Sequence, residues 1–176
     1  MVLEKIPTFS EVQTWANNNL VSSVNGKTGD VTVGDKSFIS GYQSGTLSDV
    51  DGGTLANCWG TIRVNRGDFT VVDNNTIEVN EPGVYSINYT CGFHQTSGDD
   101  RAIMHAKVRI NGLSDFDQTG SRCYIRNTTD GDRNSVSDHS IHILNAGTTV
   151  EVRVWNSKGG TGHDLTEANC AVQKIS

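Results

Sequence analysis

The stretch VYSINYTCGFH, residues 84–94, decides the fold class of this 176-residue chain. Large apolar side chains occupy every second position, and small or polar side chains lie between them. The first set is Tyr85, Ile87, Tyr89, Cys91 and Phe93, and the second is Ser86, Asn88, Thr90 and His94. A period of two is typical of a strand with one face against a core. We therefore expect a long, half-buried strand here.

The same alternation recurs in later segments. Met104, Ala106, Val108 and Ile110 alternate with His105, Lys107 and Arg109, and Val150, Val152 and Val154 alternate with Glu151, Arg153 and Trp155. The expected strands are 59–64, 69–72, 76–79, 84–94, 103–110, 122–126, 137–144, 148–155 and 169–175. Because turn signals separate these short segments, they suit a sandwich of two sheets. We predict an all-β fold.

Composition and charge support this class and exclude others. Val and Ile number 29 while Leu and Ala number 14, which favours strands over helices. A net charge of −6 argues against a nucleic-acid partner, and no apolar run resembles a signal peptide or a membrane span. The four cysteines are widely separated and form no zinc-type spacing, so we expect buried, reduced thiols.

The first twenty residues differ from the rest and predict a short helix. Residues 8–11, TFSE, match a capping box, and residues 17–19, NNN, suit a helix end. A helix of two or three turns is marginal alone in water, so its apolar residues need a partner surface. The expected partner-docking residues are Ile6, Phe9, Val12, Trp15 and Leu20. That partner is either another protein or this chain's own domain.

Residues 21–33, VSSVNGKTGDVTV, predict a β-hairpin that serves as a connector. Asn25 and Gly26 permit the positive φ of a tight turn, and Gly29 offers a second such position. Residues 34–57 are rich in Gly, Ser, Thr and Asp without a sustained period, so we expect a connector or an irregular outer strand. The expected organisation is a docking arm at 1–20, a connector at 21–57 and a sandwich at 58–176.

The histidines, acidic segments and tryptophans are the residues that could bind metals or ligands, and each also suits a structural role. A zinc site across strands from His94 and His105 is less probable than surface histidines, and His139 and His142 should lie on opposite faces. The acidic segments 97–100 and 129–132 could bind calcium, although turns require the same residues. Trp59 and Trp155 are assigned to core or rim packing. No nucleophile or cofactor motif is present, so we expect no enzyme, no cofactor and no metal.

The string VSSVNGKTGDVTV resembles the short VNGKTGxV element found near the start of tail fibres, head fibres and other appendages of tailed bacteriophages. It covers thirteen residues. The resemblance implies a virion protein whose N-terminal part attaches to the particle.

A second resemblance covers residues 58–176. The segments NTIEVNEPGVY (75–85), VRING (108–112), IHILNAGTTV (141–150) and AVQKI (171–175) are similar in order to the jelly-roll of tumour-necrosis-factor-like proteins and complement globular heads. Thr148 stands where that family usually has Asp, and the collagen-like stalk is absent. The resemblance implies a sandwich that assembles as a threefold trimer.

Together these features lead to one functional hypothesis and two alternatives. We expect a trimeric capsid decoration or head fibre protein on the virion surface, docked by residues 1–20 on the major capsid protein or another virion protein, with no membrane insertion. The first alternative is a tail-associated adhesin that binds a host receptor or glycan through loops around Asp99, Asp130 and 159–163. The second is a glycan-degrading enzyme.

Overall fold

The computed structural model describes residues 37–97, 101–113, 120–126, 133–158 and 162–176, together with two short strands nearer the N-terminus. The chain divides into two compact units, Met1–Gly34 and Asp35–Ser176. In the first unit β1 (Ser23–Val24) pairs antiparallel with β2 (Lys27–Thr28), so the strands join across positions 25 and 26. The turn residues Asn25, Gly26 and Gly29 lie outside the described residues. So do the expected helix and its docking residues Ile6, Phe9, Val12, Trp15 and Leu20.

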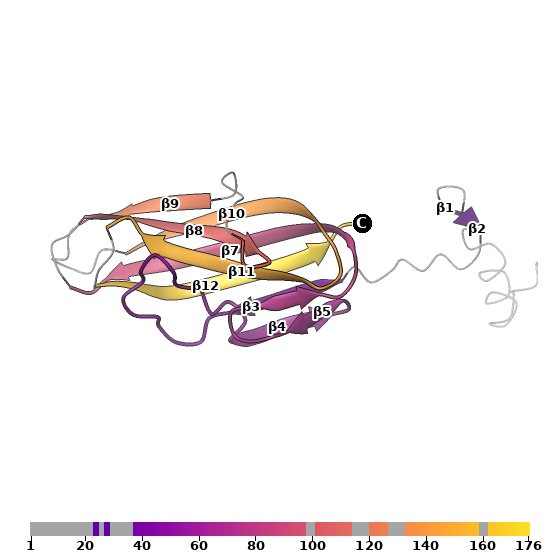
Figure 1. The fold of residues 1–176 in the computed structure, drawn as a ribbon, viewed down its shortest axis with the longest axis horizontal. Coiled ribbons are helices and arrows are strands. Elements are labelled where there is room, and N and C mark those ends of the chain that lie inside the picture. The colour runs from indigo at the N-terminus through magenta and orange to yellow at the C-terminus, as the bar shows by residue number, and fades with distance from the viewer. Residues whose placement is uncertain are drawn as a thin grey trace, which may run out of the picture. The chain divides into compact units, whose positions relative to one another are not determined.

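The second unit is a sandwich of two five-stranded antiparallel sheets (Figure 1). The first sheet has the order β10-β7-β12-β3-β4, and the second has the order β5-β6-β11-β8-β9. The strands are β3 (Phe38–Tyr42), β4 (Thr61–Arg66), β5 (Phe69–Val71), β6 (Ile77–Val79), β7 (Gly83–Gln95), β8 (Ala102–Ile110), β9 (Gly120–Ile125), β10 (Arg133–Leu144), β11 (Thr148–Asn156) and β12 (His163–Lys174). The predicted all-β jelly-roll sandwich is confirmed, and each of the nine expected strands overlaps an observed one.

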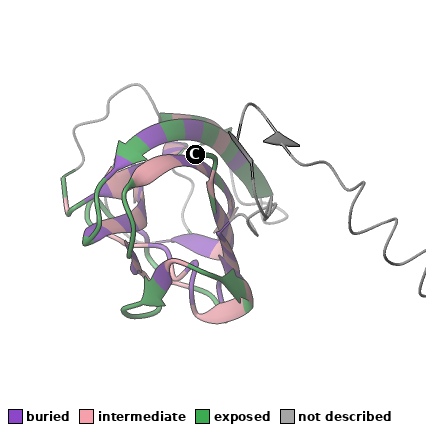
Figure 2. Ribbon diagram, turned by 90° about the vertical axis from the view of Figure 1, so that its right-hand side faces the viewer, coloured by how far each residue is buried: buried purple, intermediate pink, exposed green. Residues whose placement is uncertain are grey.

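The core lies between the two sheets and follows the alternation read from the sequence. The inward residues of β7 and β11 are nearly all fully buried, while their neighbours along each strand reach the surface (Figure 2). Lys107 departs from this pattern, because it is on the outward face of β8 yet only 9% exposed. Cys58, Cys91 and Cys170 are buried as free thiols, and Cys123 is half-buried.

The turn after β8 shows why its residues are Asn and Gly. Asn111 and Gly112 both have positive φ, at 50° and 69°, a conformation that Asn and Gly adopt with little strain. The Asn111 side chain accepts a 2.8 Å hydrogen bond from the backbone N–H of Thr149, and the Arg109 Nε donates to the Gly112 carbonyl at 2.7 Å. The turn therefore joins the ends of β8 and β11.

Residues 37–57, for which a connector or an irregular outer strand was expected, belong to the sandwich. Strand β3 lies between β12 and β4, with Ile39 opposite Val172 on one side and Asn65 on the other. The compact unit begins at Asp35, so the boundary expected at 58 moves toward the N-terminus. The strand is only five residues long and has two inward positions, Ile39 and Gly41. Two positions are too few to show a period.

Residues 43–57, which we call the strap, connect β3 to β4 and hydrogen-bond to both sheets. Leu47 pairs with Leu165 of β12, through N–H to carbonyl distances of 3.0 and 2.9 Å. Further along, the Thr54 carbonyl accepts from the Val154 N–H of β11 at 2.9 Å, and the Ala56 N–H donates to the Val152 carbonyl at 2.9 Å. The strap thus ties the sheets together through backbone bonds, which do not depend on a side-chain pattern.

Within the described residues, no helix has the length and apolar character needed to cross a membrane.

Candidate self-association surface

The outer face of the first sheet is a broad surface that points away from the core. It consists of the side chains that alternate with buried ones on β10, β7, β12 and β3. These are Ser135, Ser137, His139, Ile141 and Ile143 on β10; Val84, Ser86, Asn88, Thr90 and His94 on β7; Glu167, Asn169, Ala171 and Gln173 on β12; and Phe38, Ser40 and Tyr42 on β3. We call this surface the outer face.

Strand β10 reverses the usual distribution of polar and apolar residues over residues 140–143, whereas its inward Val136 and Leu144 follow that distribution. Its inward positions include Ser140 and His142, each 8% exposed, while its outward positions include Ile141 at 60% and Ile143 at 84% exposure. A strand with one solvated face ordinarily places its polar residues on that face. Isoleucines on the open face and a histidine toward the core therefore indicate a surface that a partner covers.

The exposed isoleucines belong to an apolar end of the outer face. Ile143 lies opposite Val84 of β7, and the Ile175 N–H donates to the Val84 carbonyl at 2.7 Å. Ile175 is itself 42% exposed. Contiguous exposed apolar side chains on a sheet are typical of protein–protein contacts, whereas single exposed residues are common on any surface.

The middle of the outer face carries small polar side chains that satisfy one another. Ser86 Oγ lies 2.9 Å from His139 Nε2, and Thr90 Oγ1 lies 2.9 Å from Ser137 Oγ. These contacts join β7 to β10. Short side chains that bond along the sheet leave the face low and regular, so another sheet or strand edge can approach it closely.

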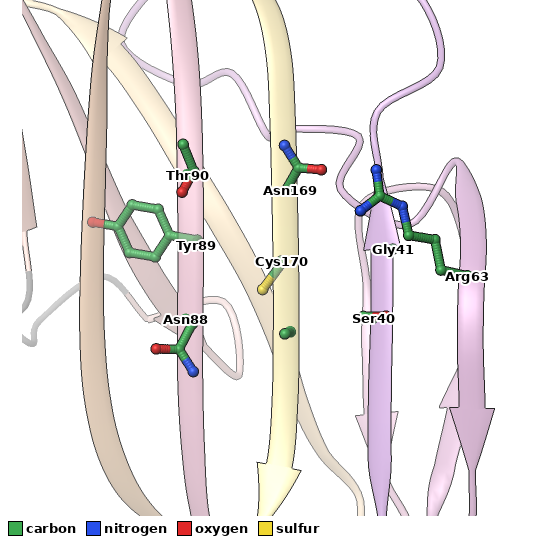
Figure 3. A pocket seen from close by; sticks show the side chains of 9 residues that line it. Ser40, Gly41, Arg63, Asn88, Tyr89, Thr90, Asn169 and Cys170 are labelled. Carbon is green, nitrogen blue, oxygen red and sulfur yellow. The ribbon is translucent and has the colours of Figure 1, made fainter.

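A shallow depression of about 190 Å³ runs across this polar region. Its lining comes from four neighbouring strands, as Figure 3 shows, and includes Ser40, Arg63, Asn88, Thr90, Asn169 and Ala171. Arg63 also lies over the ring of Tyr42, with its Cζ 4.6 Å from the ring centroid. A depression this open suits contact with a protein surface better than enclosure of a small molecule.

The structure does not bring together His94 and His105, the pair considered for a zinc site and disfavoured on sequence grounds. His94 lies on the outer face of the first sheet, opposite Arg133 and Asp164, whereas His105 lies on β8 in the other sheet. The zinc site considered for these two histidines is therefore wrong, because each side chain points outward from a different sheet. Among the described residues, no group of three or more His, Cys, Asp or Glu side chains could hold a metal. His139 and His142 do lie on opposite faces, as predicted.

His105 instead stacks on Trp155 across β8 and β11. Their ring centroids are 4.7 Å apart and the planes differ by 3°. Arg153 and Lys107 lie over the same indole, at 5.7 and 5.9 Å from its centroid. Burial is the main cause of the lowered pKa of His105, and nearby Arg122 contributes. This cluster uses Trp155 for packing on the sheet surface, while Trp59 is 2% exposed in the core.

The other candidate sites fall largely outside the described residues. This holds for Asp99, Asp100, Asp130 and Asp132, and for positions 159–161 of the loop that ends at His163. Sequence reasoning did not single out Ile141 and Ile143. The available signal was the order of residues in β10, where two isoleucines alternate with serine and histidine and either set could have faced inward.

No protein-family model matches the chain, and no curated protein matches it. Solved structures do resemble it. The structure of murine APRIL at pH 5.0 is 18% identical in sequence, has a TM-score of 0.55, and covers 80% of this chain and 99% of its own. The structure of murine APRIL at pH 8.0 is 15% identical, has a TM-score of 0.53, and covers the same shares of the two chains. The globular domain of zebrafish complement 1qA is 13% identical with a TM-score of 0.53, covering 81% and 98%. At these identities the likeness establishes the fold, and the sandwich is a jelly-roll of the tumour-necrosis-factor and complement globular-head type.

Proposed function

We propose that the chain is a trimeric structural protein of a tailed-bacteriophage particle, a capsid decoration or head fibre protein. The observation that carries self-association is the reversed pattern of β10, which exposes Ile141 and Ile143 while His142 faces inward. Covering those two side chains with a second copy removes apolar area from water, the main favourable term in protein association. A threefold arrangement is what the resemblance to tumour-necrosis-factor-like proteins implies.

The proposal of a virion role is supported by the sequence VSSVNGKTGDVTV. Its resemblance to the N-terminal element of phage appendages favours attachment through the part of the chain that precedes the sandwich. The docking residues of that part would be Ile6, Phe9, Val12, Trp15 and Leu20.

The entry point of the chain into the sandwich is compatible with this arrangement. The Ser37 carbonyl accepts a 2.9 Å hydrogen bond from the Lys174 N–H, so the described chain begins beside the end of β12. Ile175 and Val84 lie at the same end. If three copies packed together through the apolar ends of their outer faces, the three chain segments that precede β3 would start close to one another. Linked weak contacts bind more tightly than separate ones, because each raises the effective concentration of the next.

Two measurements on the full-length protein test this proposal. Native mass at high dilution and moderate salt should give three copies of the 19.0 kDa chain, and a monomer would overturn the trimer. Deletion of residues 1–20 should leave that mass at three copies of the shortened chain while abolishing co-sedimentation with particles that lack the protein. Retained co-sedimentation would overturn the docking role.

A glycan array and a polysaccharide turnover assay address the alternatives. Glycan binding that is lost when the loop near His163 is mutated would favour the adhesin, and release of sugar would favour the enzyme. The decoration protein should show neither.

A further inference from the structure

A buried histidine lies beneath the strap, at the other end of β12 from Ile175. His163 is 2% exposed, and within the described part of the chain neither of its ring nitrogens has a hydrogen-bond partner. The side-chain oxygen of Gln43, a residue 7% exposed at the start of the strap, likewise has none there. The pairing of Leu47 with Leu165 places the strap across this end of β12.

Backbone and side-chain bonds bring both sheets and the strap together around this histidine. The Val50 N–H of the strap donates to the His163 carbonyl at 2.7 Å, and the Val50 carbonyl accepts from the Asn156 Nδ2 of β11 at 2.7 Å. Gln43 Nε2 donates to the Leu165 carbonyl at 2.9 Å. Gln95 faces His163 across β7 and β12. This end of the sandwich interior is therefore lined with amides and an imidazole.

A buried imidazole has one ring nitrogen that donates and one that accepts when neutral, or two that donate when protonated. In native proteins such atoms are almost always paired with protein groups or with ordered water, because an unmade hydrogen bond in the interior is strongly unfavourable. The amide oxygen of Gln43 needs a donor for the same reason. A water molecule can donate a hydrogen bond to one polar atom and accept a hydrogen bond from another, so water can satisfy atoms of both kinds.

We propose that His163 and Gln43 hold ordered, buried water beneath the strap. Water donates to one His163 ring nitrogen or accepts from the other, and water likewise supplies the donor that Gln43 Oε1 lacks. The alternative occupant, a metal ion, is disfavoured by the ligands, since one imidazole with neutral amides forms a poor metal site. The strap covers this end of β12, and its backbone bonds to both sheets keep such water from exchanging quickly.

The first test uses the unmodified protein. A crystal structure at about 1.5 Å resolution should show a density peak within hydrogen-bond distance of a His163 ring nitrogen, in the range of about 2.7–3.2 Å. A peak with water-like height and two or more polar neighbours supports the proposal. Empty density, a protein side chain bonded to both ring nitrogens, or a peak with metal-like scattering would overturn it.

The second test counts long-lived waters in solution by oxygen-17 magnetic relaxation dispersion. The variant His163→Phe should lose dispersion amplitude equivalent to at least one water molecule relative to the unmodified protein. The matched control is His105→Phe, because His105 lies on the outward face of the other sheet, stacked on Trp155, and should give unchanged amplitude. Unchanged amplitude in a folded His163→Phe variant would contradict the proposal, and the crystal structure decides the question if that variant does not fold.

Discussion

The hydroxyl of Tyr89 in β7 donates a 2.6 Å hydrogen bond to the carbonyl oxygen of Ala106 in β8 and so connects the two sheets. The backbone N–H of Ser121 donates to the same hydroxyl at 3.4 Å. Burial raises the pKa of Tyr89 well above its usual value, with a smaller contribution from Asp138, so the phenol stays protonated and able to donate. One side chain thus links β7, β8 and β9.

Replacement Tyr89→Phe should lower the free energy of unfolding by about 1–2 kcal/mol, because the Ala106 carbonyl loses its buried donor. Chemical denaturation measures the change. The control is Tyr42→Phe, on the half-buried outer face, which should change stability by less than about 0.5 kcal/mol. If the two replacements changed the free energy of unfolding by the same amount, the hydrogen bond from Tyr89 to Ala106 would make no contribution of its own to stability.

Gly41 should tolerate no side chain. A Cβ at this position would lie 2.6 Å from the Cys58 carbonyl oxygen, a backbone atom that cannot move aside cheaply. We expect Gly41→Ala to lower the free energy of unfolding by about 1–3 kcal/mol, in the range of overpacked cores. Gly52→Ala is the control, since a Cβ there meets nothing within 4 Å. A Gly41→Ala variant as stable as its control would disprove the close approach.

The double replacement Ile141→Thr with Ile143→Thr should weaken self-association. Threonine keeps the β-branched shape that suits a strand while replacing an ethyl group with a hydroxyl. Loss of apolar burial at both positions should raise the dissociation constant at least about tenfold, which dilution-dependent native mass can measure.

Val72→Thr provides the comparison for that experiment. Val72 is 54% exposed and follows β5 in the other sheet, so its replacement should leave the mass unchanged. A double variant that assembles as well as Val72→Thr would rule out the apolar end of the outer face as the contact.

Stability should fall as pH drops below about 6.5. Burial lowers the pKa of His142, and burial followed by Arg122 lowers that of His105, both from 6.5. Between the lowered pKa and 6.5 the unfolded chain binds more protons than the folded one, so folding is favoured at the higher pH and disfavoured as pH falls.

Unfolding titrations at pH 7.5, 6.5 and 5.0 measure this effect. The variant His142→Gln should show a weaker pH dependence than the unmodified protein, because it lacks one of the two titrating groups. The same slope in both proteins would exclude His142 as a contributor.

The four thiols should differ in reactivity in the folded state. Burial raises the pKa of Cys123 to about 11 and that of Cys58 to about 12, and Cys91 and Cys170 are raised well above 9. At pH 8 the half-buried Cys123 should react with iodoacetamide about 100-fold more slowly than a free thiol, because the thiolate is the reactive form. The other three should react only after unfolding. Peptide mapping that finds Cys58, Cys91 or Cys170 labelled as fast as Cys123 would contradict this order.

The sandwich could be predicted from sequence where a strand was long enough to repeat its pattern. Strand β7 has inward side chains from Tyr85 to Phe93, and this period alone indicates its buried face. Strand β3 gave no such signal, since it offers only Ile39 and Gly41 to the core and is held by backbone bonds from β12 and β4. The bonds to β12 join residues more than a hundred positions apart without requiring particular side chains.

The candidate surface was less accessible to prediction for a related reason. In β10 the alternating sets are Ser140 with His142 and Ile141 with Ile143, and polarity alone assigns the isoleucines to the core. The register with β7 places them outside, opposite Ser86 and Val84. The sequence likewise could not show whether His94 and His105 share a site. They are eleven positions apart in the chain but belong to different sheets.

The position of β3 has a mechanical consequence. It is the first strand of the sandwich, and a pulling force applied at Ser37 and directed along β3 loads the domain along the axis of this strand. Its hydrogen bonds to β12 and β4 run perpendicular to that axis, so the load is shared by two ladders in shear instead of opening one bond at a time. Resistance to forced unfolding depends on the barrier to leaving the native state. A tether attached in this way should hold against drag far better than one attached to a strand at the sheet edge.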